Sequence, residues 1–230
     1  MDRRSLLKLA AGGAVFTWVP SAELLAKTPG KRYAMIFDVR RCTGCLSCTV
    51  SCAVENRTEP GRERTEVAQM TVRTKTGEAV VAFPHQCNHC GNPPCVQVCP
   101  VKATYKRRED GIVVIDWTKC IHCMACVAAC PYGARKADPE KRNPPEKCNF
   151  CIHRVEEGLL PACVETCIGK ARVFGDLNDP ESEVAQLVRD NKVYALLDGL
   201  GTKPSIFYIG LPDNLDENTF LELSPTDWQR

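Results

Sequence analysis

The chain has 230 residues, of which 16 are cysteine, and its formal net charge is +2 when cysteine is counted as neutral. This length fits one large domain or two small fused ones, and so many cysteines indicate disulfides or metal. Aromatic residues make up only 7% of the chain, so we expect bound cofactors to support the core. Metal centres held by thiolates would make the folded protein acidic, and the charge therefore gives no case for nucleic-acid binding.

The chain starts with a basic segment followed by a weakly apolar run. Arg3 and Arg4 are adjacent, and the run from Leu9 to Val19 is too short to span a bilayer. The segment resembles a twin-arginine export signal, although Asp2 and Leu6 stand where such signals usually have other residues. A disordered basic tail is the alternative interpretation.

We therefore expect residues 1–26 to be a signal segment, with any cleavage between Ser21 and Lys27. The twin-arginine route carries proteins that have already folded with their cofactors, so cysteines can reach an oxidising compartment as metal ligands. The expected location is the periplasmic side of the inner membrane. No later segment is long and apolar enough to span a membrane.

Short strands bounded by turns are predicted along the rest of the chain. They are expected at residues 32–38, 79–83, 111–116, 171–174 and 205–209. A helix is predicted from Asp179 as N-cap, with Pro180 at the first position, to Val188. The three-residue gaps before the last cysteines, such as 126–130, suit short helices.

The cysteines recur in four similar groups, and none lies outside them. The groups are Cys42-x2-Cys45-x2-Cys48-x3-Cys52, Cys87-x2-Cys90-x4-Cys95-x3-Cys99, Cys120-x2-Cys123-x2-Cys126-x3-Cys130 and Cys148-x2-Cys151-x11-Cys163-x3-Cys167. Three closely spaced cysteines can direct their thiolates to one iron–sulfur cubane, whereas the fourth points toward another. Because zinc sites do not follow this spacing, the pattern favours iron–sulfur ligation over zinc or disulfides.

The residue after each group suggests how the groups pair. Pro100 and Pro131 follow the second and third groups, whereas Ala53 and Ile168 follow the first and fourth. This difference favours a nested arrangement in which the second group pairs with the third and the first with the fourth. We expect an α+β fold of two interleaved bacterial-ferredoxin-like [4Fe–4S] units with short strands, short helices and long loops. The outer unit would span 27–86 with 147–178, the inner unit 87–146, and a C-terminal extension 179–230.

With these groups, the chain from about Arg32 to Gly210 resembles the four-cluster ferredoxin-type beta subunits of molybdopterin oxidoreductases. That family serves dimethyl sulfoxide, polysulfide, thiosulfate, nitrite and tetrathionate reductase systems. The long gap between Cys151 and Cys163, which ends within the stretch Leu160-Pro-Ala-Cys-Val-Glu165, is specific to the group. Within it the chain is most similar to tetrathionate reductase beta subunits, through residues 32–42, 49–52, 87–95 and 201–210.

The resemblance implies four [4Fe–4S] clusters, each on four cysteines. The implied sets are Cys42/Cys45/Cys48/Cys167, Cys148/Cys151/Cys163/Cys52, Cys87/Cys90/Cys95/Cys130 and Cys120/Cys123/Cys126/Cys99. The implied partners are a membrane-anchored quinol-oxidising subunit and a catalytic molybdopterin subunit, with this chain relaying electrons between them. Besides tetrathionate reductase, the alternatives are other exported respiratory complexes linked to nitrite, polysulfide or thiosulfate, or sulfite.

Three classes of function compete: an electron relay, a catalytic iron–sulfur protein and a structural metal module. A catalytic cluster needs an open iron, and 16 cysteines close four clusters without leaving one open. A scaffold does not need four clusters. The sequence therefore predicts a non-catalytic electron-transfer subunit, in which the protein supplies position and potential.

Histidines and basic residues lie near the cysteines in sequence. We interpret the histidines as surface residues or contacts to cluster sulfur, because each cluster already has four ligands. They are His85, His89, His122 and His153. Nearby basic residues either raise cluster potentials or are ordinary solvated charges; they are Arg40, Arg41, Lys119, Lys147 and Arg154. Trp117 is expected to pack over a cluster.

Overall fold

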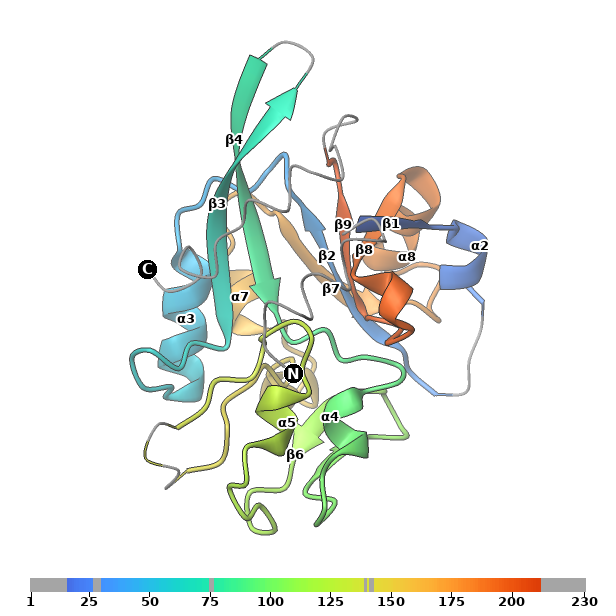
Figure 1. Ribbon diagram of the computed structural model, residues 1–230. Helices are drawn as coiled ribbons and strands as arrows, with labels where there is room; N and C mark the ends of the chain where they lie inside the picture. The colour runs from blue at the N-terminus through green and yellow to red at the C-terminus, as the bar shows by residue number, and fades with distance from the viewer. Residues whose placement is uncertain (1–15, 27–29, 75–76, 139, 141–142, 212–230) are drawn as a thin grey trace.

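The computed structural model describes residues 16–26, 30–74, 77–138, 140 and 143–211, in which short elements alternate with long loops (Figure 1). The strands are β1 (Phe16–Val19), β2 (Tyr33–Asp38), β3 (Thr65–Thr74), β4 (Gly77–Gln86), β5 (Thr104–Lys106), β6 (Val113–Ile115), β7 (Arg172–Asp176), β8 (Val193–Leu196) and β9 (Ile206–Ile209). The helices are α2 (Ser21–Leu24), α3 (Ser47–Asn56), α4 (Pro94–Gln97), α5 (Ala125–Ala128), α6 (Ile152–Val155), α7 (Ala162–Glu165), α8 (Glu183–Asp190) and the 3₁₀ turn η1 (Asp198–Leu200). The expected α+β class is confirmed.

A five-stranded sheet with the order β1-β8-β9-β2-β7 is the largest element. Strands β2 and β9 are parallel, and the other neighbours in this sheet are antiparallel. Both faces of the sheet are covered by other parts of the chain, which explains why β2 is an almost continuous apolar run. Ile36 and Phe207 pack toward Val188 of α8, whereas Phe37 and Tyr208 face the cysteine loops.

Two further hairpins are not paired with the strands of this sheet. Strands β3 and β4 pair along their whole length, from Thr65 opposite Gln86 to Thr74 opposite Gly77, and the far end projects beyond the body (Figure 1). Strands β5 and β6 form a small antiparallel pair in the inner unit. The sequence predicted only part of β4 and missed β3, because the polar residues Glu66, Gln69 and Arg73 hide its period.

The helix after β7 begins later than the sequence predicts. Its N-cap is Ser182, whose Oγ accepts the N–H of Ala185 at 3.2 Å, and α8 spans Glu183–Asp190. Asp179 instead accepts the N–H of Glu181 at 2.9 Å within the preceding turn. The later start places Val184 and Val188 against the sheet, where both are fully buried, so tertiary packing decides between two plausible caps.

The part of the expected signal segment that the structure describes is built into the sheet. Strand β1 pairs antiparallel with β8, with Phe16 opposite Leu196 and Val19 opposite Val193. Val19 and Leu24 are buried in the same hydrophobic cluster as Val184 and Val188 of α8. A cut in the region where cleavage was expected would therefore remove an edge strand. Arg3 and Arg4 lie outside the described residues.

The segment after residue 178 also belongs to this sheet, since it supplies β8 and β9 between β1 and β2. It therefore packs with the strands of the outer unit. No helix in the described ranges is long and apolar enough to cross a membrane.

Candidate iron–sulfur sites

The four cysteine groups share one backbone feature. The residue just before the second cysteine has a positive φ in every group: 68° at Gly44, 43° at His89, 56° at His122 and 55° at Phe150. A left-handed residue turns the chain sharply, so that the cysteines on either side can face the same space. Such a conformation costs a non-glycine residue about 1–2 kcal/mol, and strain of this kind concentrates at functional sites.

The third cysteine of each group occupies one helical position, the second residue of a short helix. These are Cys48 in α3, Cys95 in α4, Cys126 in α5 and Cys163 in α7. The backbone N–H groups of a first helical turn lack partners within the helix and favour a nearby negative charge. The shared position therefore suits a thiolate ligand.

The helix starts explain one irregular spacing. In the first and third groups, the left-handed residues Leu46 and Met124 start the helix. In the second group Pro93 and Pro94 do so, with Pro94 as the first helical residue. The two additional residues in this gap thus deliver Cys95 to the same helical position.

Two of the four expected ligand sets line cavities. Their cysteines are Cys42, Cys45, Cys48 and Cys167 in the first cavity and Cys87, Cys90, Cys95 and Cys130 in the second. Each cavity combines three cysteines of one group with the last cysteine of another. This is the nested pairing of groups that the sequence favoured.

In the other two sets, the cysteines affect one another's pKa values. Burial, together with Cys163 and Cys151, raises the pKa of Cys52 to about 12. Burial, Cys163 and Cys52 raise the pKa of Cys148 well above its usual value. The Nδ2 of Asn56 donates to the Sγ of Cys52 at 3.6 Å and to the Sγ of Cys151 at 3.7 Å, so members of this set lie close together. In the last set Cys120 acts on Cys126, Cys99 accepts the N–H of Thr104 at 3.5 Å, and Cys123 is exposed.

All sixteen cysteines are free, so none is used in a disulfide. Within the described residues, no three side chains of Cys, His, Asp or Glu are close enough to share one metal ion. A [4Fe–4S] cluster separates its thiolates more widely than a single ion does. The arrangement therefore fits clusters better than zinc.

Two buried arginines line the two cavities. Arg135 and Arg172 are each only 3% exposed, and Arg172 borders the first cavity and Arg135 the second. Among the described residues, no ion pair with a carboxylate includes either of them. A buried charge without a counter-charge is costly. Negatively charged clusters in the cavities would supply that counter-charge, so the chain's own charges fit the group.

The four histidines lie in different surroundings. His89 stacks on Phe150 with ring centroids 3.8 Å apart, and its Nδ1 accepts the N–H of Val113 at 3.1 Å. Burial lowers the pKa of His89 well below its usual value and that of His85 to about 4. His153 lies on the surface beside Glu55, with Nε2 and Oε1 2.7 Å apart. His122 is half-buried between Cys120 and Cys123.

Of the basic residues singled out from sequence, Lys147 is the buried one, and its Nζ donates to the carbonyl of Cys148. Three of the others pair with carboxylates: Arg40 with Asp38, Lys119 with Asp116, and Arg154 with Glu55 and Glu165. The Nε of Arg41 donates to the carbonyl of Gly169. Trp117 is 56% exposed, and its packing over a cluster stays a prediction.

Comparison with known proteins decides the class of these sites. The family description "4Fe-4S dicluster domain" matches residues 78–177 and, in a second family, residues 34–103. The B subunit of tetrathionate reductase from Salmonella typhimurium is 48% identical over an alignment of 206 residues, and the alignment covers 88% of this chain and 82% of that protein. This protein belongs to the ferredoxin-type iron–sulfur subunits of reductase complexes.

Further members of this family are similar over most of their length. The B subunit of tetrathionate reductase from Archaeoglobus fulgidus is 44% identical, with 79% of this chain and 84% of the relative covered. The B chain of polysulfide reductase from Wolinella succinogenes is 40% identical, with 78% and 94% covered. The chain is therefore an iron–sulfur electron-transfer subunit of the ferredoxin type that binds [4Fe–4S] clusters.

Proposed function

We propose that this subunit carries four [4Fe–4S] clusters on the four ligand sets named above. It relays electrons between a membrane-anchored quinol-oxidising subunit and a catalytic molybdopterin subunit. The observation that carries the proposal is the pair of cavities, each lined by four cysteines and a buried arginine. The clusters supply one-electron redox chemistry, while the chain fixes their positions and their electrostatic surroundings.

The same arrangement supports a non-catalytic role. Every cysteine belongs to a set of four, so each cluster would have all its irons ligated by protein. Substrate then has no open iron to bind. The reaction catalysed by the complex takes place in the partner, and this chain conducts electrons to or from it.

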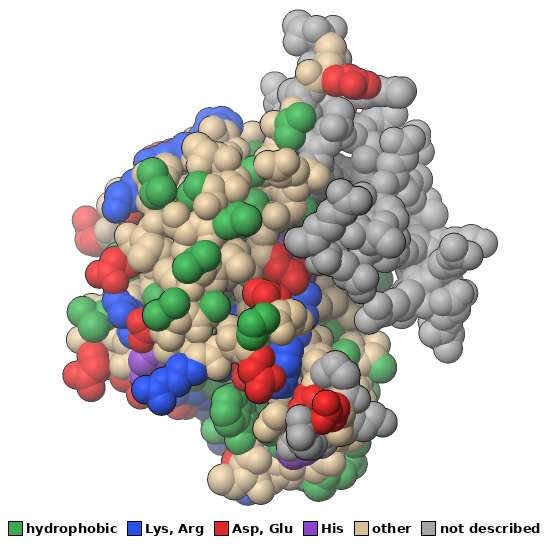
Figure 2. Space-filling view, turned by 90° about the vertical axis from the view of Figure 1, so that its left-hand side faces the viewer, with side chains coloured by type: hydrophobic (Ala, Val, Ile, Leu, Met, Phe, Trp, Pro, Cys, Tyr) green, Lys and Arg blue, Asp and Glu red, His purple; other side chains and the backbone are tan. Residues whose placement is uncertain are grey.

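Two exposed cysteines suggest where electrons enter and leave. Cys45 belongs to the outer unit and Cys123 to the inner unit. Beside Cys45 lies Leu46, and 73% of Ile168 is exposed next to Cys167; beside Cys123, 58% of Ile121 is exposed. Apolar side chains are exposed between charged ones over the face in Figure 2 as well. We propose that these exposed apolar residues contact the partner subunits.

Tetrathionate is the proposed substrate of the complex, because two of the relatives are named as tetrathionate reductase subunits. Polysulfide is the second candidate, supported by the likeness to a polysulfide reductase component. Arg3 and Arg4 support export to the periplasmic side of the inner membrane. Replacing both by lysine is expected to leave the cluster-loaded chain in the cytoplasm when it is produced without its partners, and unchanged export would contradict this route.

The cluster count is tested by elemental analysis of the anaerobically purified holoprotein. Four clusters require about sixteen iron and sixteen acid-labile sulfide atoms per chain. Zinc, or about eight irons in fully loaded protein, would contradict the four-cluster proposal.

The relay is tested with the substitution Cys126→Ser in the assembled complex. Loss of one inner cluster should reduce quinol-driven reduction of tetrathionate and of polysulfide, whichever the complex accepts. Activity of the catalytic subunit with an artificial dye donor should remain, because that route bypasses this chain. Quinol-driven turnover that persists after the cluster is shown to be lost would argue against a relay.

A further inference from the structure

The two buried arginines occupy equivalent positions in two different cysteine groups. Arg135 lies five positions after Cys130, and Arg172 lies five positions after Cys167. The corresponding position is Arg57 in the first group and Thr104 in the second. Arg57 is exposed, so each ferredoxin-like unit has one buried arginine at this place in the repeat.

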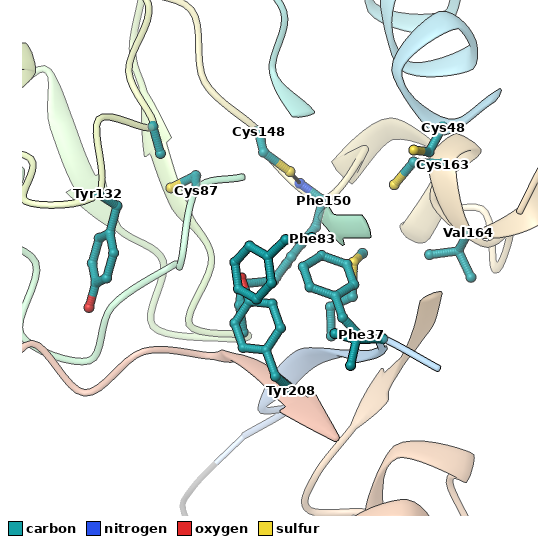
Figure 3. Packing of buried hydrophobic residues seen from close by; sticks show 14 of the residues in the cluster. Phe37, Cys48, Phe83, Cys87, Tyr132, Cys148, Phe150, Cys163, Val164 and Tyr208 are labelled. Atoms are coloured by element: carbon teal, nitrogen blue, oxygen red, sulfur yellow. Dashed lines mark hydrogen bonds between the residues drawn. The ribbon is translucent and has the colours of Figure 1, made fainter. Parts of the chain in front are cut away.

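Arg172 lies between the two ligand sets of the outer unit. Burial by itself lowers the pKa of its guanidinium, but Cys163, Cys48 and Cys167 raise it above the usual value. Cys163 belongs to one set, and Cys48 and Cys167 belong to the other. The thiol groups of Cys48 and Cys163 lie side by side in Figure 3. One guanidinium therefore faces cysteines of both outer sets.

Arg135 has the same relation to the inner unit. Its Nη2 donates to the Sγ of Cys95 at 3.1 Å. Burial lowers the pKa of Arg135, whereas Cys95, Cys126 and Cys87 raise it above the usual value. Cys95 and Cys87 belong to one inner set and Cys126 to the other. Both buried arginines thus lie at the junction of two clusters.

Neutral groups hold each guanidinium in place. Arg172 donates to Gln86 Oε1 at 2.8 Å and to Thr65 Oγ1 at 2.9 Å, and it lies 4.7 Å from the ring centroid of Phe37. Arg135 donates to Thr104 Oγ1 at 3.3 Å. Because these partners are uncharged, they fix the position of the arginine without cancelling its charge.

We propose that Arg172 and Arg135 are positioning residues that each raise the reduction potentials of two clusters at once: Arg172 acts on both outer clusters and Arg135 on both inner ones. Reduction adds one negative charge to a cluster, and a fixed buried cation stabilises the reduced form. The effect is strong because little solvent screens the pair. This inference rests on the proposed ligand sets.

The test is a redox titration of the holoprotein followed by electron paramagnetic resonance. In Arg172→Gln, the midpoint potentials of two clusters should shift downward and the other two should stay unchanged. In Arg135→Gln, the complementary two should shift. Arg172→Lys, which keeps the charge, should recover part of the shift. This pattern needs no prior assignment of signals to clusters.

Arg57→Gln is the matched control, since it removes an exposed arginine from the equivalent position of the first group and should change no potential. Arg172→Met and Arg135→Met repeat the test without burying a polar amide, should the glutamine variants load less iron. Four unchanged potentials in iron-replete Arg172 and Arg135 variants would overturn this inference alone. A wild-type protein with fewer than four clusters would contradict both the inference and the proposed function.

Discussion

At the scale of single residues, the first cavity depends on a close approach between two distant segments. Gly169 follows the last cysteine of this cavity, and Arg41 precedes the first one. A Cβ on Gly169 would lie 2.1 Å from the carbonyl oxygen of Arg41. The Nε of Arg41 in turn donates to the carbonyl of Gly169 at 3.0 Å. Glycine is thus required here for space rather than for backbone conformation.

We therefore expect Gly169→Ala to separate the two segments and to prevent assembly of this one cluster. The holoprotein should lose about four of its sixteen irons, as measured by elemental analysis. Gly199→Ala is the control, because no heavy atom lies within 4 Å of a Cβ at that position. Full iron content in Gly169→Ala would show that the backbone can yield without opening the site.

The sequence allowed the ligand sets to be proposed, but it did not reveal the two buried arginines. The four groups define the proposed ligand sets, because the spacing of cluster ligands is a local property of the sequence. The buried arginines were not identified, because charge near a cysteine in sequence does not reveal burial: Arg154 is paired at the surface, whereas Arg135 and Arg172 are enclosed by segments far along the chain. Their equal spacing from Cys130 and Cys167 was the available signal.

At the scale of elements, strands with an apolar period were predicted well and irregular ones were not. Strands β2 and β9 are apolar runs that pair side by side, and both were expected from sequence. Strand β3 is stabilised by its pairing with β4 over ten residue pairs, and a cross-strand partner of this kind is invisible to a local pattern. Strand β1 was not predicted, because its pairing with β8 is also non-local.

We predict that the N-terminal elements contribute to stability. Leu24 in α2 is 4% exposed and packs in the cluster that contains α8, so Leu24→Ala should lower the free energy of unfolding by about 2 kcal/mol or more. Chemical denaturation of the unprocessed holoprotein would measure this loss. Glu23→Ala, at the exposed neighbouring position, should change stability little. Equal stability of the two variants would show that α2 is not part of the folded unit.

At the scale of the whole molecule, the core is divided between cysteine-dependent and cysteine-free regions. The group of buried hydrophobic side chains between the sheet and α8 contains only aliphatic and aromatic residues. The inner unit has a small hydrophobic cluster of its own, in which Val96 and Val127 pack against Cys95, Val113 and Cys126. The inner unit also adds Ile112, Tyr132 and Ala134 to the main hydrophobic core, but they pack there together with cysteines. We therefore expect the order of the inner loops to depend on ligation, and the hairpin β5–β6 is too short to be stable alone.

Removal of iron should therefore unfold the molecule unevenly. After anaerobic chelation, hydrogen exchange is expected to accelerate first and most strongly in α4, β5, β6 and α5, where ligation links the cysteines and compensates the buried charge of Arg135. Protection should persist longer in β8, β9 and α8, which share a hydrophobic cluster that contains no cysteine. Mass-spectrometric exchange of chelated protein, compared with protein handled identically without chelator, measures this difference. Simultaneous loss of protection in all of these elements would instead show that the clusters and the sheet form one cooperative unit.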